Sequence, residues 1–108
     1  MTAPTTPGHP RHQLDDALGH PVRFSLAAAL AQTEEIDFGT LRDHLQVSDS
    51  VLSKQATALE SAGYVTIRKG YIGKRPRTWL KLSKKGHQVW RNHLAALQDI
   101  AFPPHSDH

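Results

Sequence analysis

Hydrophobic residues in the first half of the chain recur every four positions, the spacing of one buried stripe on a helix. Val22, Leu26 and Leu30 have this spacing, and Pro21 suits the first position of a helix. The pattern predicts a long helix that begins at Pro21 and fades at Gln32.

Two more helices are predicted on either side of a tight connection. A strand fragment at 36–38 precedes a short helix over about 39–45, and Ser48 is a good N-cap for a longer helix over 49–62. Gly63 ends this longer helix as a C-cap residue. Its inward stripe is expected to consist of Leu52, Ala56 and Leu59.

The spacing of apolar residues then changes to two. Alternation over 65–69 predicts a strand, the Gly- and Pro-containing segment 70–76 predicts a turn, and 77–82 predicts a second strand. Ser83 caps a final helix over 84–101. The two strands and their turn form a β-hairpin.

A chain of 108 residues has room for one domain. Residues 1–12 are rich in Pro, Thr and His and show no periodicity, so we expect a disordered N-terminal tail. Residues 103–108 are expected to form a second disordered tail. The ordered domain is expected over 13–102, with one or two helical turns at 14–18 before the first long helix.

The predicted order is helix, helix, short helix, helix, hairpin, helix. Two short helices joined by a tight turn and followed by a β-hairpin form a winged helix-turn-helix, which is a mainly α fold with a small β-hairpin (α+β). The second helix of such a pair is thin enough to enter the major groove of DNA. We therefore expect 49–62 to be a recognition helix and the basic hairpin tip, 69–77, to reach the minor groove or the backbone.

The distribution of charge supports a nucleic-acid partner. Lys and Arg number 13 and Asp and Glu number 10, a formal net charge of +3. Nine of the basic residues lie between Arg68 and Arg91, and no acidic residue occurs between Glu60 and Asp99. A field of one sign attracts polyanions, although a charge run alone also fits a solvated face or an anionic membrane surface. Folding needs no cations at the hairpin tip, and like charges there repel, so their density favours an anionic partner.

The residues on the outward face of the recognition helix are small donors and acceptors with one cation. They suit base contacts, although an ordinary wet helix face has the same composition. For Asp49 we favour a role at the helix N-terminus over acceptance from a cytosine amino group. The predicted DNA-binding residues are Ser48, Asp49, Ser50, Ser53, Lys54 and Thr57 on the helix and Lys74, Arg75, Arg77 and Thr78 on the wing.

Three segments resemble known bacterial regulators. Residues 73–86 resemble the wing of MarR-type winged-helix regulators, 47–65 resemble the recognition helix shared by MarR- and ArsR-type regulators, and 19–23 resemble the opening of the first long helix of ArsR-like repressors. Together the resemblance covers about 14–101. The matching positions are Leu59, Gly63, Val65, Leu80, Leu82, Ser83 and Gly86.

The resemblance implies a sequence-specific DNA-binding transcriptional regulator, which we expect to be a repressor that acts as a homodimer. It implies base contacts from Ser50, Ser53 and Lys54 and wing contacts from Arg75 and Arg77. Full MarR proteins carry additional long helices that dimerise and hold ligands. This chain is shorter, so a small-molecule effector remains an open expectation.

A homodimer follows from geometry as well, because one winged helix covers only a few base pairs and specific sites usually join two half-sites. The final helix has more apolar surface than one small core requires. The alternative is that this surface only covers its own domain. The predicted dimer residues are Leu14, Leu18, Trp90, Leu94, Leu97 and Ile100.

Several classes of function are disfavoured. The chain has no cysteine, which excludes a disulfide, a thiolate zinc site and a cysteine nucleophile. Of eight histidines, His87 and His93 face different sides of one helix, so we predict no metal and no cofactor. The N-terminus lacks the apolar stretch of a secretion signal, and no apolar run approaches the roughly 20 residues of a membrane helix, so we expect a cytoplasmic protein without a membrane partner.

Three other functions compete with a sequence-specific regulator. A non-enzymatic winged-helix module that binds proteins in a larger assembly would not need the basic wing. A protein that binds RNA or DNA with little sequence preference fits the charge but not the motif. An enzyme is the weakest hypothesis, because no carboxylate pair, nucleophile with its base or phosphate loop stands out.

Overall fold

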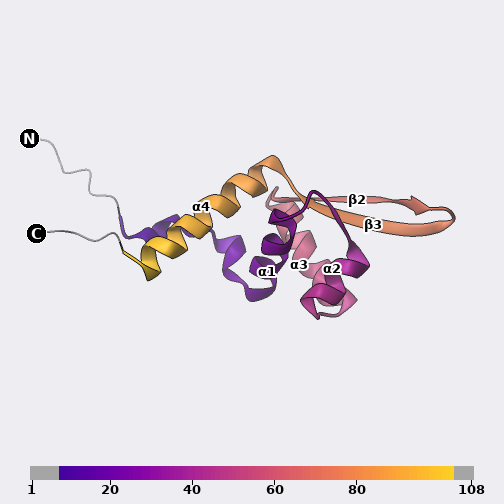
Figure 1. Cartoon of the computed structure of the whole chain (residues 1–108), viewed down its shortest axis with the longest axis horizontal. Coiled ribbons are helices and arrows are strands. Elements are labelled where there is room, and N and C mark those ends of the chain that lie inside the picture. The colour runs from indigo at the N-terminus through magenta and orange to yellow at the C-terminus, as the bar shows by residue number, and fades with distance from the viewer. Residues whose placement is uncertain (1–7, 104–108) are drawn as a thin grey trace, which may run out of the picture.

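The computed structural model describes residues 8–103, and these form a helical body from which a β-hairpin projects (Figure 1). The elements match the predicted mainly α class with a small antiparallel sheet. In chain order they are the 3-10 helices η1 (Pro10–Gln13) and η2 (Asp16–Gly19), α1 (Pro21–Ala31), β1 (Ile36–Asp37), α2 (Phe38–Leu45), α3 (Asp49–Ser61), β2 (Val65–Ile72), β3 (Arg75–Leu82) and α4 (Lys84–Ala101).

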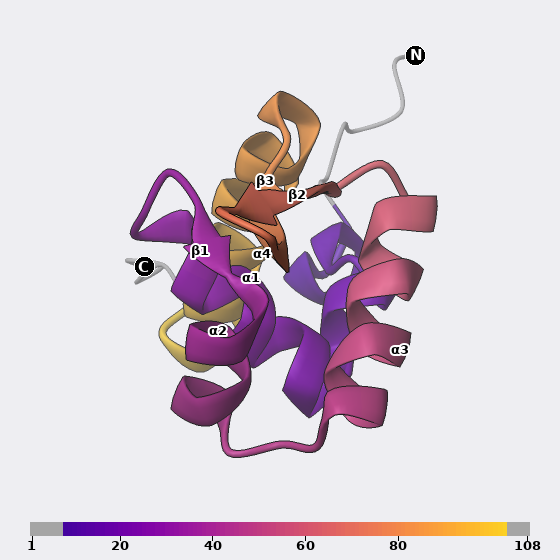
Figure 2. The ribbon, with the colours of Figure 1, turned by 90° about the vertical axis from the view of Figure 1, so that its right-hand side faces the viewer.

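The core lies where α1, α2 and α3 meet the base of the hairpin. The predicted stripe of α3 is buried as expected, and Leu26 and Leu30 bring the stripe of α1 to the same place. Viewed from the hairpin end, α2 and α3 stand on either side of α1 (Figure 2). The largest fully buried side chains are Leu26, Leu30, Leu41, Leu52, Leu59 and Leu80.

Polar side chains define where the helices begin. The ring of His20 accepts from the amide of Val22 at 3.1 Å, and the hydroxyl of Ser83 accepts from the amide of Gly86 at 2.9 Å. Ser48 caps α3 in the same way, by accepting from the amide of Val51 at 3.2 Å. The predicted caps at Ser48 and Ser83 are therefore confirmed.

The hairpin is longer than the sequence pattern predicted. The segment 70–76, expected to be a turn, is mostly strand, and only Gly73 and Lys74 form the turn between β2 and β3. Gly73 has a φ of 61°, which suits a two-residue hairpin turn. Pro76 pairs with Tyr71, next to the pair that closes the turn. Hydrogen-bonded pairs alternate in an antiparallel ladder, so the missing N–H of Pro76 falls at a position that does not need one.

The sheet has three strands in the order β1-β3-β2. The fragment β1 pairs with β3 only through Ile36 with Leu80 and Asp37 with Trp79. The strand fragment expected at this place is therefore confirmed. Beyond these pairs the hairpin is a two-stranded ribbon, which Figure 1 shows extending away from the helices.

The N-terminal segment is more ordered than expected. Residues 10–12, assigned to a disordered tail, begin η1, which lies against α4. Leu18, predicted at a dimer interface, is only 3% exposed and belongs to the core of its own domain. The assignment of Leu18 to a dimer face is therefore wrong. The parts of the two predicted tails at 1–7 and 104–108 lie outside the described residues.

Candidate nucleic-acid interface

The connection between α2 and α3 sets the direction of the recognition helix. Gln46 ends α2 with a left-handed φ of 56°, and the amide of Val47 donates to the carbonyl of Arg42 at 3.3 Å. Ser48 then starts α3. This short connection sets the orientation of α3 relative to α2. In this orientation one face of α3 packs on the core and the other is exposed. The exposed residues include Ser50, Ser53, Lys54 and Thr57, the outward face that the sequence predicted.

The carboxylate of Asp49 accepts a hydrogen bond from an arginine side chain rather than from a backbone amide of its own helix. One oxygen accepts from a guanidinium nitrogen of Arg42 at 2.8 Å, and Arg42 also contacts Asp43 at 2.9 Å. These two carboxylates raise the pKa of Arg42, and Asp43 is the larger cause. Asp49 thus lies in the first turn of α3 but joins α3 to α2, a contact that residue spacing alone did not suggest.

Side chains of the wing alternate between two faces. Ile67, Lys69 and Tyr71 of β2 share one face, and Arg68 and Ile72 lie on the other. The first face continues from the core and is turned towards α3. Through the register of the hairpin, the face turned towards α3 also carries Leu80, Thr78 and Pro76, and the opposite face carries Lys81, Trp79, Arg77 and Arg75.

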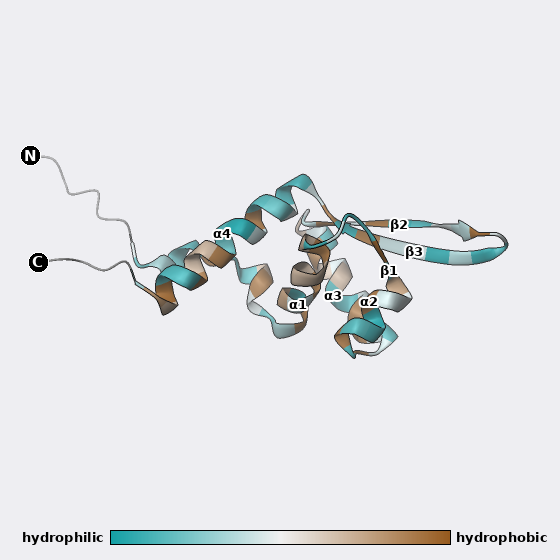
Figure 3. Cartoon of the chain, in the orientation of Figure 1, coloured by the Kyte–Doolittle hydropathy of each residue, from teal (hydrophilic) through white to brown (hydrophobic). Residues whose placement is uncertain are grey.

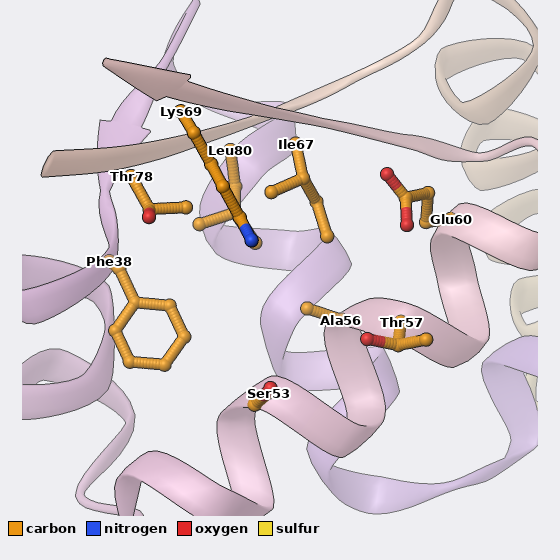
Figure 4. Close-up of a pocket in the computed structure, with 9 residues that line it drawn as sticks. All are labelled: Phe38, Ser53, Ala56, Thr57, Glu60, Ile67, Lys69, Thr78 and Leu80. Atoms are coloured by element: carbon orange, nitrogen blue, oxygen red, sulfur yellow. The ribbon is translucent and has the colours of Figure 1, made fainter.

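A groove of about 620 Å³ separates α3 from the near face of the wing. Ser53 and Thr57 lie on its α3 side, and Lys69 reaches into it from β2 (Figure 4). Polar groups from the predicted recognition helix and from the wing therefore meet across one open groove. Its lining residues are Phe38, Ser53, Ala56, Thr57, Glu60, Ile67, Lys69, Thr78 and Leu80.

Two cations on the far face of the wing are held by carboxylates. Arg68 donates to both oxygens of Glu35 at 2.8 and 3.2 Å, and its guanidinium lies 4.0 Å from the ring centre of Trp79. Arg77 lies 3.9 Å from a carboxylate oxygen of Asp37. The hydrogen bond from Arg68 lowers the pKa of Glu35. Part of the basic charge counted in the sequence is thus balanced within the molecule.

The remaining wing cations are exposed. Lys69, Lys74 and Arg75 make no ion pair with any residue between 8 and 103, and neither does Lys54 on α3. Of the wing residues proposed from the sequence, Lys74 and Arg75 are at the tip, Thr78 faces the groove and Arg77 faces away from it. Lys69 was not selected from the sequence, although the alternation over 65–69 placed it on the same face as the core residues.

A part-buried polar network supports α3 from behind. Asp15 accepts a hydrogen bond from the hydroxyl of Tyr64, directly after α3, and its own amide donates to the ring of His93 at 2.9 Å. The guanidinium of Arg23 donates to the buried amide oxygen of Gln55, on α3, at 2.9 Å. The hydrogen bond to Asp15 is the main cause that raises the pKa of Tyr64 to about 12. His93 is 3% exposed, so this histidine is part of the buried structure.

The described part of the chain contains neither a membrane span nor a cluster of metal ligands. No helix within 8–103 is long and apolar enough to cross a membrane. No three His, Cys, Asp or Glu side chains in the same range come together as a metal site would require.

A family model described as a winged helix DNA-binding domain matches residues 22–101. The chain belongs to this family. An uncharacterised protein of Methanocaldococcus jannaschii is 30% identical over 80 residues, which span 74% of this chain and 87% of the relative.

Solved structures share the fold. A transcriptional regulator homologue from Pyrococcus horikoshii superposes with a TM-score of 0.77 at 24% identity, covering 84% of this chain and 91% of that one. NadR in complex with 4-hydroxyphenylacetate has a TM-score of 0.68 at 24% identity, covering 83% of this chain but 63% of that longer one. PcaV of Streptomyces coelicolor, solved with its natural ligand, has a TM-score of 0.64 at 17% identity, covering 89% and 69%. The chain shares the winged-helix fold of these three proteins.

Proposed function

We propose that the protein is a sequence-specific repressor of transcription that binds duplex DNA as a homodimer. In this proposal α3 lies in the major groove and the wing contacts the adjacent minor groove or the backbone. The observation that carries it is the open groove between α3 and the wing. Ser53 and Thr57 expose hydroxyl groups on one side, and Lys69, which makes no ion pair within residues 8–103, lies on the other. A repressor of this kind acts by occupying its site and excluding other proteins from it.

The face of α3 supports sequence-specific binding. Ser50, Ser53, Lys54 and Thr57 are exposed. The three hydroxyl side chains are small enough to let the helix approach base edges, and Lys54 is a flexible cation. Ser48 is engaged as the N-cap and Asp49 by Arg42, so we assign these two to positioning the helix at the groove. In this proposal α3 can bind in the major groove without a base contact from Ser48 or Asp49.

Selection of bound duplexes from a random pool tests the proposal directly. We expect one enriched sequence with two similar half-sites whose centres are about one helical turn apart. Ser53→Ala should change the preferred base at one position in each half-site, with a discrimination of about 1 kcal/mol or more. If the selection enriches no particular sequence, the protein binds nucleic acid with low sequence specificity and the proposal is wrong.

The wing contribution is tested by salt dependence. Replacement of both Lys74 and Arg75 by Ala should weaken binding to the selected duplex and reduce the slope of log K against log salt by about two for each half-site bound. Arg91→Ala, which removes a cation from α4, is the matched control and should leave the slope unchanged. Equal slopes for all three proteins would contradict contact between the wing and phosphates.

The C-terminal helix supports the dimer. Leu94, Leu97 and Ile100 are only partly buried by their own chain, and Phe102 at the end of α4 is 79% exposed. Trp90 is less available, because its ring packs 5.0 Å from that of Phe24. We therefore place the dimer contact towards the C-terminal end of α4, with Leu14 of the N-terminal segment beside it.

A further inference from the structure

Large apolar side chains are exposed at the tip of the wing, where they stabilise no core. Tyr71 is 71% exposed and Ile72 is 54% exposed. Within residues 8–103 the other exposed large hydrophobic side chains are Val51, at 38%, and Phe102, at 79%. Two of the four are thus adjacent in sequence, at the end of β2. Figure 3 shows a short hydrophobic segment near the tip of the otherwise mostly hydrophilic outer hairpin.

The register of the hairpin spreads these groups over both faces of the tip. Tyr71 pairs with Pro76 on the face turned towards α3, and Ile72 pairs with Arg75 on the opposite face. The two-residue turn at Gly73 and Lys74 makes the end narrow. The tip is therefore an apolar wedge, defined here as Tyr71, Ile72 and Pro76, at the end of a two-stranded ribbon.

Unpaired cations surround the wedge. Lys69, Lys74 and Arg75 flank it, and the described residues 61–98 contain no carboxylate side chain. The minor groove of DNA presents the matching chemistry, because its phosphate walls attract cations while sugars and base faces accept apolar groups. A minor groove about 6 Å wide is too narrow for a two-stranded ribbon with side chains on both faces. The groove must widen if the tip enters it.

We propose that Tyr71 and Ile72 enter the minor groove beside the α3 site, partly unstack one base step and bend the duplex. This inference rests on the proposed binding of duplex DNA and adds a second source of specificity. Pyrimidine–purine steps such as TA and CA are the easiest to unstack. The protein would then select such a step at a position where it makes no hydrogen bond to a base edge.

The bend is measured by energy transfer between dyes at the two ends of the selected duplex. We compare the wild-type protein with the double variant Tyr71→Thr and Ile72→Thr. Threonine suits a strand, and both side chains lie outside the core, so the variant should fold with an unchanged melting temperature. We expect the wild-type protein to bend the duplex by roughly 20° or more and the variant to leave it nearly straight. Lys74→Ala is the charge control and should lower the salt slope while the bend remains.

A mismatched base pair at the wing step provides a second measurement, because it lowers the cost of unstacking. The wild-type protein should bind the mismatched duplex about tenfold more tightly than the fully paired duplex, and the double variant should bind the two equally. Wild-type protein that binds with a steep salt slope but leaves DNA straight would overturn the wedge and leave the proposed function standing. A double variant that bends DNA as strongly as the wild type would also overturn the wedge, because the bend would then not depend on Tyr71 and Ile72. Failure to bind any duplex would overturn both proposals.

Discussion

Among the glycines within residues 8–103, Gly86 has the least room for a side chain. A Cβ atom at this position would overlap the carbonyl oxygen of Tyr64, which the amide of Ser83 holds by a hydrogen bond of 2.9 Å. The contact fixes the start of α4 against the start of β2. The Gly86 match to MarR-type wings thus has a direct physical cause.

Gly86→Ala should lower the free energy of unfolding by about 3 kcal/mol, because the two backbones must move apart. Gly19→Ala is the matched control, since a Cβ there meets no atom within 4 Å. Chemical denaturation of both variants measures the difference. Similar midpoints for the two would show that the junction of β2 and α4 adjusts without cost.

His93 makes the stability of the protein depend on pH. Burial lowers the pKa of its ring, against the opposing charge of Asp15, and its Nδ1 atom must stay unprotonated to accept from the amide of Asp15. The other ionisable groups that line the same hollow are Asp16, His20 and Arg23. As pH falls below about 6.5, the unfolded chain takes up a proton at this position before the folded protein does. The free energy of unfolding therefore decreases in that range.

His93→Asn separates this effect from the titration of the other histidines. The amide oxygen of Asn accepts the same hydrogen bond but does not titrate. We expect the free energy of unfolding of the variant to decrease less than that of the wild type between about pH 7 and pH 5. Urea denaturation at each pH measures this difference. His93→Ala should cost about 1–3 kcal/mol at neutral pH, because the amide of Asp15 loses its partner. Parallel pH profiles for wild type and His93→Asn would exclude the histidine as the cause.

At the scale of elements, the helices were the predictable part of the fold. The bounds of α4 and the starts of α1 and α3 match the sequence pattern, because caps and apolar stripes are local signals. The strands of the wing are longer than the sequence predicts, because Gly70 and Pro76 are typical turn residues but lie in the strands here. Gly70 instead lies against the ring of Trp79, where a Cβ would approach within 3.1 Å, so the glycine belongs to the strand.

The site was predictable only in part. The helical spacing of apolar residues in 49–62 predicts which face of α3 is exposed. The ion pair of Arg68 with Glu35, however, joins residues 33 positions apart, and the hydrogen bond between Asp15 and His93 joins residues 78 positions apart. No local pattern encodes such pairs. A count of charges therefore does not reveal that Arg68 and Arg77 are paired with carboxylates. Likewise, composition alone does not reveal that residues 10–13 form η1 and contact α4.

Arg68 and Lys69 are neighbours on opposite faces of β2, and this gives a test of which face of the wing meets DNA. Lys69→Ala should reduce the salt slope of DNA binding by about one for each half-site bound, because its charge has no ion pair within residues 8–103 and lies in the groove beside α3. Arg68→Ala should change the slope less, because Glu35 already balances that charge. Binding measured from low to high salt gives both slopes. A larger change in slope for Arg68→Ala than for Lys69→Ala would show that the opposite face of the wing meets the duplex.

At the scale of the whole molecule, the end of α4 decides whether two copies act together. Ile100 is partly exposed on α4, and Gln98 is exposed on a different side of the same turn. Ile100→Glu places a charge in the proposed interface, so it should convert a particle of twice 12.0 kDa into one of 12.0 kDa in light scattering. Gln98→Glu adds the same charge outside the interface and should leave the dimer intact.

Loss of the dimer should also weaken binding to the two-half-site duplex by about a hundredfold or more, because the second half-site is then bound independently. Binding to a single half-site should be the same for Ile100→Glu, Gln98→Glu and the wild type, since α3 and the wing are untouched. Titration of each protein against both duplexes provides this comparison. A wild-type protein that is monomeric at micromolar concentration, or an Ile100→Glu variant that keeps full affinity for the double site, would contradict a dimer formed through α4.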